Sequence, residues 1–145
     1  MKISTRGRYG LMAMYSVFQN YGKGPISINE IAEKEHLSVA YLEQLFALLK
    51  KAGLVKSIRG AFGGYELTRD PSNIKIKEIL NALEDDIALS CSVMSNKPEC
   101  RNLEECATKD ILDKLQIKID AVLDSLTLAD MWGRYGNLFR QCGYH

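Results

Sequence analysis

The sequence has few of the features on which enzymes and membrane proteins depend. It contains only two histidines, His36 and His145, and it has no Gly-x-Gly-x-x-Gly motif, phosphate-binding loop or His-Glu-x-x-His motif. No apolar run approaches the roughly 18 residues that a membrane-spanning helix needs. The N-terminus lacks the apolar stretch and cleavage site of a secretory leader. These absences predict a non-catalytic cytoplasmic protein with no membrane partner and no small-molecule substrate.

Long disorder is also excluded, because 46% of the 145 residues are hydrophobic and the net charge is only +1. The charge is unevenly divided along the chain. Residues 1–70 hold ten Lys and Arg against six Asp and Glu (net +4), whereas residues 71–145 hold nine against twelve (net −3). A basic first half favours an anionic partner such as nucleic acid.

The first half predicts three helices followed by a β-hairpin. Apolar residues at helical spacing predict a helix over 8–21, a Ser27–Glu30 capping box opens a second, and Ser38 caps a third that ends near Ala52. Alternating residues predict strands over 54–58 and 65–68, on either side of a glycine-rich tip. With a further helix over 76–83, this order is that of a winged helix-turn-helix, so we expect a mainly α fold with a small β-wing and a DNA-binding domain over residues 1–84.

The second half divides into three predicted segments: a cysteine-bearing loop over 85–106, a long helix over 107–126 and a C-terminal tail over 127–145. Spacings of four and three predict an apolar seam on the helix, formed by Thr108, Leu112, Leu115, Ile119, Val122 and Leu126. A helix of this length spans about 30 Å, more than the small preceding domain requires. We therefore expect it to bury this seam against a second subunit and form a homodimer.

The third helix and the hairpin tip carry the groups expected to contact double-stranded DNA. Residues left on or near the exposed first turns of the helix are Ser38, Val39, Tyr41, Glu43 and Gln44. Gln pairs with adenine, Glu accepts from cytosine, and hydroxyls reach phosphate or base edges. Arg59, beside the wing glycines, suits a narrow minor groove. The candidate phosphate contacts are Lys2, Arg6, Arg8, Lys50, Lys51 and Lys56.

Three of the four cysteines, Cys91, Cys100 and Cys106, lie within sixteen residues. In a reducing compartment, thiols clustered in a polar segment are more often metal ligands or redox groups than disulfides. Three thiolates with one histidine or carboxylate suit tetrahedral zinc, and a metal-free thiol switch is a further alternative.

Long motifs make the chain similar to a known family. Residues 1–10 (MKISTRGRYG), 41–45 (YLEQL), 53–55 (GLV) and 58–65 (IRGAFGGY) resemble those of the Rrf2 family of bacterial winged-helix regulators, and the similarity extends to residues 127–130. The resemblance implies a dimeric regulator, expected to be a repressor, on a pseudo-palindromic DNA operator. It also implies that the helix with Tyr41, Glu43 and Gln44 lies in the major groove, and that Arg59 enters the minor groove.

The resemblance further implies an iron–sulfur cluster, 2Fe–2S rather than 4Fe–4S, held by Cys91, Cys100 and Cys106. Two departures from the family's iron–sulfur members concern these ligands: the gap between the first two cysteines is longer, and Lys109 replaces the histidine that acts as fourth ligand. The remaining candidates for a fourth ligand are Glu104, Glu105, Asp110, Cys142 and His145. A third departure, Ala40 in place of a hydroxyl residue, bears on operator preference.

Two alternatives stay open at the level of sequence. The family includes a cysteine-metabolism repressor without a cluster, so this chain could be a cluster-free, zinc-bound or thiol-switched regulator. A winged fold that binds protein rather than DNA is the other alternative.

Overall fold

The first helix begins at a serine cap that the apolar pattern did not mark. The computed structural model describes residues 3–84 and 107–132, and in it α1 spans Thr5–Gln19. Ser4 Oγ accepts a hydrogen bond from the Gly7 N–H at 3.1 Å, which satisfies one of the free donors of the first turn. The predicted helix over 8–21 is therefore displaced: it starts at Thr5 and ends before Tyr21, which is exposed.

The next two helices form the helix-turn-helix. α2 (Ile28–Glu35) is capped by Ser27, whose hydroxyl accepts from the Glu30 N–H. The reciprocal bond of a capping box, from the Ser27 N–H to the Glu30 carboxylate, is not formed in the described chain. His36 ends α2 in the left-handed conformation (φ 55°), and Ser38 caps α3 (Val39–Lys51) through the Tyr41 N–H.

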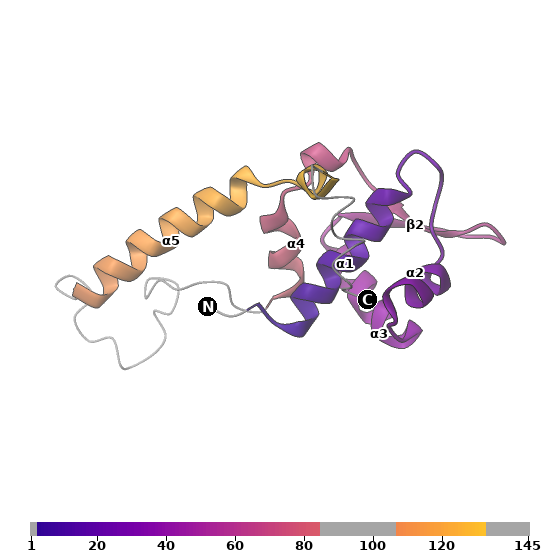
Figure 1. Ribbon diagram of the computed structural model, residues 1–145, viewed down its shortest axis with the longest axis horizontal. Helices are drawn as coiled ribbons and strands as arrows, with labels where there is room; N and C mark the ends of the chain where they lie inside the picture. Colours follow the sequence, from indigo (N-terminus) through magenta and orange to yellow (C-terminus); the bar gives the residue numbers. More distant parts are fainter. Residues whose placement is uncertain (1–2, 85–106, 133–145) are drawn as a thin grey trace.

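The wing is a two-stranded antiparallel sheet. β1 (Val55–Ile58) pairs with β2 (Gly64–Leu67), with Val55 opposite Leu67 and Ile58 opposite Gly64. Both strands lie within one residue of the predicted spans at each end. In Figure 1 the hairpin projects from the helical body, at the side opposite to the long helix.

The remaining elements are one short helix, one long helix and two 3-10 turns. η1 (Pro71–Asn73) precedes α4 (Ile76–Leu83), which has the predicted bounds. α5 (Ala107–Ser125) extends away from the winged part in Figure 1, and η2 (Leu128–Trp132) follows it. Ion pairs join α5 to α4, with Lys77 Nζ 3.7 Å from carboxylate oxygens of both Asp120 and Asp124.

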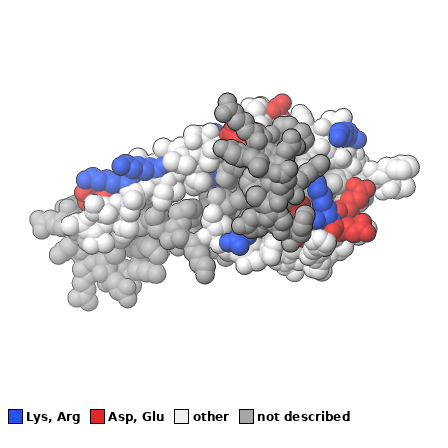
Figure 2. Space-filling view, viewed as in Figure 1, with Lys and Arg blue, Asp and Glu red and all other residues white. Residues whose placement is uncertain are grey.

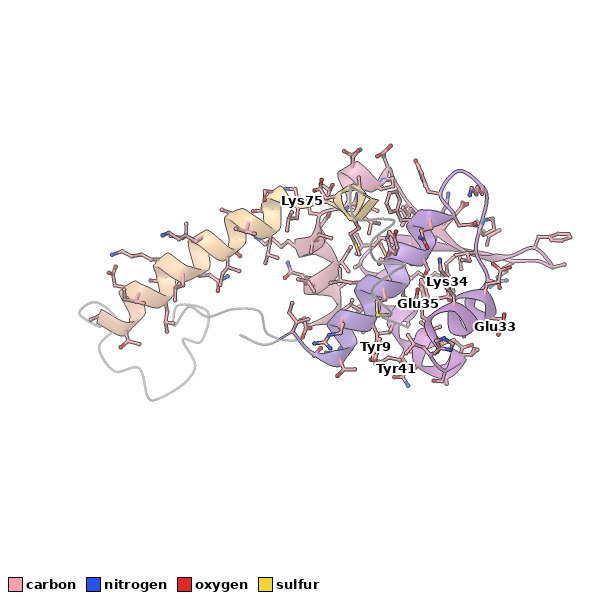
Figure 3. All side chains as sticks on the ribbon, in the orientation of Figure 1. Tyr9, Glu33, Lys34, Glu35, Tyr41 and Lys75 are labelled. Atoms are coloured by element: carbon pink, nitrogen blue, oxygen red, sulfur yellow. The ribbon has the colours of Figure 1, made fainter. Side chains whose placement is uncertain are left out.

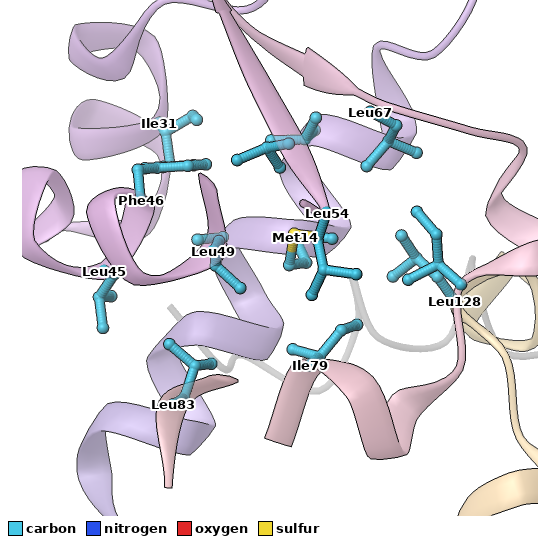
Figure 4. Close-up of a cluster of buried hydrophobic side chains, with 14 of the residues drawn as sticks. Met14, Ile31, Leu45, Phe46, Leu49, Leu54, Leu67, Ile79, Leu83 and Leu128 are labelled. Atoms are coloured by element: carbon cyan, nitrogen blue, oxygen red, sulfur yellow. The ribbon is translucent and has the colours of Figure 1, made fainter. Parts of the chain in front are cut away.

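One apolar core holds the winged part together. Its members come from all four helices of the first half and from both strands, and the largest fully buried side chains include Met14, Ile31, Leu42, Leu45, Phe46, Leu49, Leu54, Ile79 and Leu83 (Figure 4). Leu128, from the segment after α5, is also fully buried here. Its N–H donates to the Ile74 carbonyl at 2.8 Å. The predicted mainly helical fold with a small wing is confirmed.

Candidate nucleic-acid interface

α3 has one face in the core and one in solvent. Leu42, Leu45, Phe46 and Leu49 are fully buried, whereas Glu43 and Gln44 are exposed. The side chains of Glu43 and Gln44 form no hydrogen bond or ion pair with another described residue. The carboxylate and amide of these side chains are therefore available to an external ligand, on a helix whose position the core fixes.

The first turn of α3 combines capping with exposure. Ser38 is exposed, and its Oγ accepts from the Tyr41 N–H at 3.1 Å. The hydroxyl hydrogen of Ser38 remains free for donation to an acceptor such as a phosphate oxygen. Val39 is the first residue of the helix and is half-buried, so only part of its side chain faces outward.

Tyr41 is positioned by an aromatic contact from α1. Its ring meets the ring of Tyr9 edge to face, with centroids 6.1 Å apart and planes at 89° (Figure 3). Edge-to-face pairs of this kind are favourable because the positive ring edge faces the negative ring face. Tyr9 was not among the predicted site residues. Its helical spacing from Ala13 and Val17 places it on the core-facing side of α1, but this spacing does not indicate a contact with Tyr41.

The wing carries Arg59 directly after β1. Arg59 is exposed and forms no ion pair or hydrogen bond with the described residues. The wing is held against α3 at two places: Phe46 stacks on Tyr65 with ring centroids 4.4 Å apart, and Lys50 Nζ donates to Ser57 Oγ at 3.1 Å. The orientation of the hairpin relative to α3 is thus fixed by packing as well as by chain connection.

Some of the other basic side chains are exposed, and others form an ion pair or a hydrogen bond within the chain. Arg8 and Lys51 are exposed, but Lys56 Nζ lies 3.1 Å from a Glu66 carboxylate oxygen, and the Arg6 Nε donates to the Leu83 carbonyl. Lys2 lies outside the described residues. On the face drawn in Figure 2, the basic side chains of the described residues are scattered among acidic and uncharged ones. On this face, the described residues therefore form no single broad basic patch.

α5 leaves apolar side chains in solvent. Ile111, Leu115, Val122 and, directly after the helix, Leu126 are 41–57% exposed, and they follow one another at spacings of four, seven and four residues. Leu112, Ile119 and Leu123 beside them are half-buried. No residue of α5 is buried in the single chain. The exposed apolar stripe is therefore a surface that a partner can cover.

The predicted metal ligands Cys91, Cys100 and Cys106 lie outside the described residues, as do Glu104, Glu105, Cys142 and His145. Asp110 is described, and its carboxylate lies 2.8 Å from Lys114 Nζ. This hydrogen bond and charge raise the pKa of Lys114. Lys109 occupies the position at which the resemblance implies a histidine, and its Nζ lies 3.3 Å from Asp113 Oδ2. Within residues 3–84 and 107–132, no group of three His, Cys, Asp or Glu side chains could hold a metal ion.

A membrane-crossing helix would have to be long and predominantly apolar. Across the described ranges, none of the helices meets both conditions.

Comparisons with known proteins give one consistent result. A family described as Rrf2, iron-dependent transcriptional regulator, matches residues 3–134. The transcriptional regulator CymR of Bacillus subtilis is 43% identical over 131 residues, which cover 90% of this chain and 89% of CymR. The structure of CymR, described as the global cysteine regulator of B. subtilis, is similar to this one with a TM-score of 0.76 at 40% identity. The match covers 90% of this chain and 95% of that one.

Proteins named IscR are similar to a comparable degree. The structure of T. potens IscR has a TM-score of 0.72 at 46% identity and covers 90% of this chain and 85% of that one. The transcriptional regulator IscR of Escherichia coli is 35% identical over 132 residues, which cover 90% of this chain and 80% of IscR. Both kinds of relative thus match nearly the whole chain.

Proposed function

The chain belongs to the Rrf2 family of transcriptional regulators, which bind DNA and are not enzymes, and we propose that it is a homodimeric cytoplasmic repressor whose operator affinity is switched by an iron–sulfur cluster on Cys91, Cys100 and Cys106. The observation that carries the DNA-binding part is the division of α3 into a buried apolar face and an exposed polar one. The cluster and the dimer rest on further observations, given below.

In this proposal α3 enters the major groove and contacts bases through Glu43 and Gln44. Both are exposed and unpaired among the described residues, and they lie in the N-terminal half of the helix, which reaches deepest into the groove in helix-turn-helix proteins. Ser38, Val39 and Tyr41 lie at the helix start, where they would contact backbone or base edges. Arg59, unpaired on the wing, would enter the adjacent minor groove.

The proposed dimer is supported by the exposed apolar stripe of α5. Soluble monomers rarely leave such a stripe in water, and two copies of a helix with this spacing bury it against each other. The two copies of α3 would then be presented to two half-sites of one operator, as two-fold symmetry requires.

The cysteine set fits an iron–sulfur cluster by donor chemistry. Thiolates are the ligands that such clusters take, and three of them leave one position for a weaker donor: Glu104, Glu105, Asp110, Cys142 or His145. A 2Fe–2S cluster bound here would supply a redox-active and chemically reactive group. The protein would hold it between the end of α4 and the start of α5, so a change at the cysteines acts on the connection between the winged part and the proposed dimer helix.

A cluster-free regulator is the second candidate, and the 43% identity to CymR favours it. In that case the same three cysteines would hold zinc or act as a thiol switch. These alternatives differ in what the purified protein contains.

The experiment is anaerobic purification with iron, sulfide and zinc analysis and a visible spectrum, followed by binding to a duplex selected by the protein from a randomised pool. We expect a coloured protein with iron and sulfide, and loss of both when all three cysteines are replaced by serine. Retention of one equivalent of zinc, or a colourless metal-free protein that binds its duplex normally, would overturn the cluster.

A matched pair of variants tests the DNA contacts separately. Gln44→Ala removes an exposed side chain of α3, and Glu33→Ala removes an exposed one from α2. We expect only the first to weaken binding and to relax base preference, by about 1–3 kcal/mol per lost base contact. Equal affinities for both variants would count against α3 as the contacting helix.

A further inference from the structure

Phe62 lies at the tip of the wing with 94% of its side chain exposed. It is the most exposed large apolar side chain of the described residues, and the next, Ile117 of α5, is 68% exposed. Among the described residues, the Phe62 ring is not part of the core cluster and remains almost fully open to solvent. Its placement in water therefore indicates a contact with a partner.

The turn that presents Phe62 has a defined shape. The Gly63 N–H donates to the Gly60 carbonyl at 3.0 Å, and this closes a tight turn over Ala61 and Phe62. Gly60 has φ +119°, and a Cβ on Gly63 would lie 2.2 Å from the Ile58 carbonyl oxygen. Only glycine fits these two positions without strain. The turn thus fixes the backbone from which the Phe62 ring projects at the end of the hairpin.

The chemistry beside the ring favours DNA as the partner. The unpaired Arg59 guanidinium lies three residues before Phe62 on the same hairpin. Its charge is attracted to the negative potential of a narrow minor groove, which would bring the tip to the base steps. The stacking of Phe46 on Tyr65 fixes the hairpin against α3, so the tip moves together with the helix proposed to enter the major groove.

We propose that Phe62 is an apolar wedge, which enters the minor groove beside Arg59 and partly unstacks a pyrimidine–purine step of the operator. Apolar side chains that enter this groove separate base pairs and bend the duplex toward the major groove. Pyrimidine–purine steps unstack most easily, so the wedge selects sequence at a position where it forms no hydrogen bond. This inference rests on the DNA binding proposed above. It gives Phe62, whose side chain cannot hydrogen-bond to a base edge, a role in sequence specificity.

The experiment uses the full-length protein and a duplex that it has selected from a randomised pool, carrying 2-aminopurine at the pyrimidine–purine step nearest the wing. We expect the wild-type protein to raise the 2-aminopurine fluorescence and to bend the duplex, as measured by energy transfer between its ends. Phe62→Ala should abolish both signals and weaken binding about tenfold, while Phe62→Leu keeps most of each. Ala61→Ser, at the same tip, is the matched control and should behave as the wild type.

The outcomes separate the wedge from the proposed function. If the wild-type protein binds no duplex at all, DNA binding itself fails. If Phe62→Ala binds and bends the duplex and raises the 2-aminopurine fluorescence as the wild type does, DNA binding stands and the wedge is wrong. If Phe62→Ala changes only the sedimentation of the protein and leaves fluorescence and bending unchanged, Phe62 contacts a protein rather than DNA, and the wedge is also wrong. Circular dichroism verifies that each variant is folded.

Discussion

The Glu84 carboxylate accepts hydrogen bonds from both the backbone N–H and the hydroxyl of Ser4, each 2.9 Å long. Ser4 caps α1, and Glu84 follows α4, so one carboxylate joins the first turn of the chain's first helix to the end of its fourth. The partial positive charge of the helix N-terminus adds to this attraction. Glu84, the last described residue before the cysteine-bearing segment, is therefore anchored directly to the first turn of α1.

Replacing this carboxylate tests the anchor. Glu84→Ala leaves the Ser4 N–H and hydroxyl without their acceptor in a half-buried site, so we expect the free energy of unfolding to fall by about 1–2 kcal/mol. Urea unfolding followed by circular dichroism measures this. Glu33→Ala, which removes an exposed carboxylate with no partner among the described residues, should change it by less than about 0.5 kcal/mol. Equal stabilities of the two variants would contradict the anchor.

The proposed dimer predicts that the two sides of α5 respond differently to charge. Leu115 belongs to the exposed apolar stripe, whereas Ile117, two residues later, lies about 200° further around the helix. We expect Leu115→Lys to shift the sedimenting species from dimer to monomer and to weaken operator binding at least tenfold, because the lysines would be buried without partners. Ile117→Lys should leave both unchanged. Sedimentation velocity decides this, and a dimer retained in Leu115→Lys would place the interface elsewhere.

Elements with regular apolar spacing and strong end signals could be predicted well from the sequence. α4 has the predicted bounds, and α3 ends one residue before the predicted Ala52, where Gly53 stops the helix. The start of α1 was missed because a cap, Ser4, and two small buried residues, Gly7 and Gly10, determine it rather than large apolar ones. The packing of α4 favours glycine at position 10, because a Cβ there would lie 2.0 Å from Leu83 Cδ1 and the Leu83 side chain would have to shift.

Tertiary contacts account for what the sequence left open at the candidate site. The local sequence pattern predicts that Glu43, Gln44 and Arg59 are exposed, and they are exposed in the structure. The support of Tyr41 by Tyr9 joins two helices, and no local periodicity reveals such a pairing. The same applies to Leu128, which follows the long helix yet fills the core of the winged part.

The turn of the helix-turn-helix offers a stabilising substitution. His36 has φ 55° and ψ 43°, a left-handed conformation in which a side chain crowds its own backbone. We expect His36→Gly to raise the free energy of unfolding by about 1 kcal/mol, equivalent to roughly 2–4 °C in Tm. His36→Val, which is β-branched, should lower it. Differential scanning calorimetry measures both, and a His36→Gly protein less stable than the wild type would show that the imidazole itself makes a stabilising contact.

The lowered pKa of Glu78 makes part of the free energy of unfolding depend on pH in the acid range. Burial alone would raise its pKa, but the Lys75 N–H, 2.9 Å away, and Arg69 Nη2, 2.6 Å away, outweigh burial and lower the pKa below its ordinary value of 4.5. A carboxyl whose pKa is lower in the folded state stabilises the fold above its unfolded pKa, and this contribution is lost as the pH falls through the lowered value. We expect the wild type to lose its advantage over Glu78→Gln as the pH falls from 6 to 3.

Urea unfolding at intervals across this range measures the difference between the two proteins. The matched control is Asp70→Asn, because the Ser72 hydroxyl and N–H likewise lower the pKa of Asp70. Asp70 caps only the short η1 turn and is exposed, so solvent screens it and its pH-dependent contribution should be the smaller of the two. A gap between wild type and Glu78→Gln that stays constant, or widens, toward pH 3 would mean that the ionised Glu78 carboxylate is not what Lys75 and Arg69 stabilise.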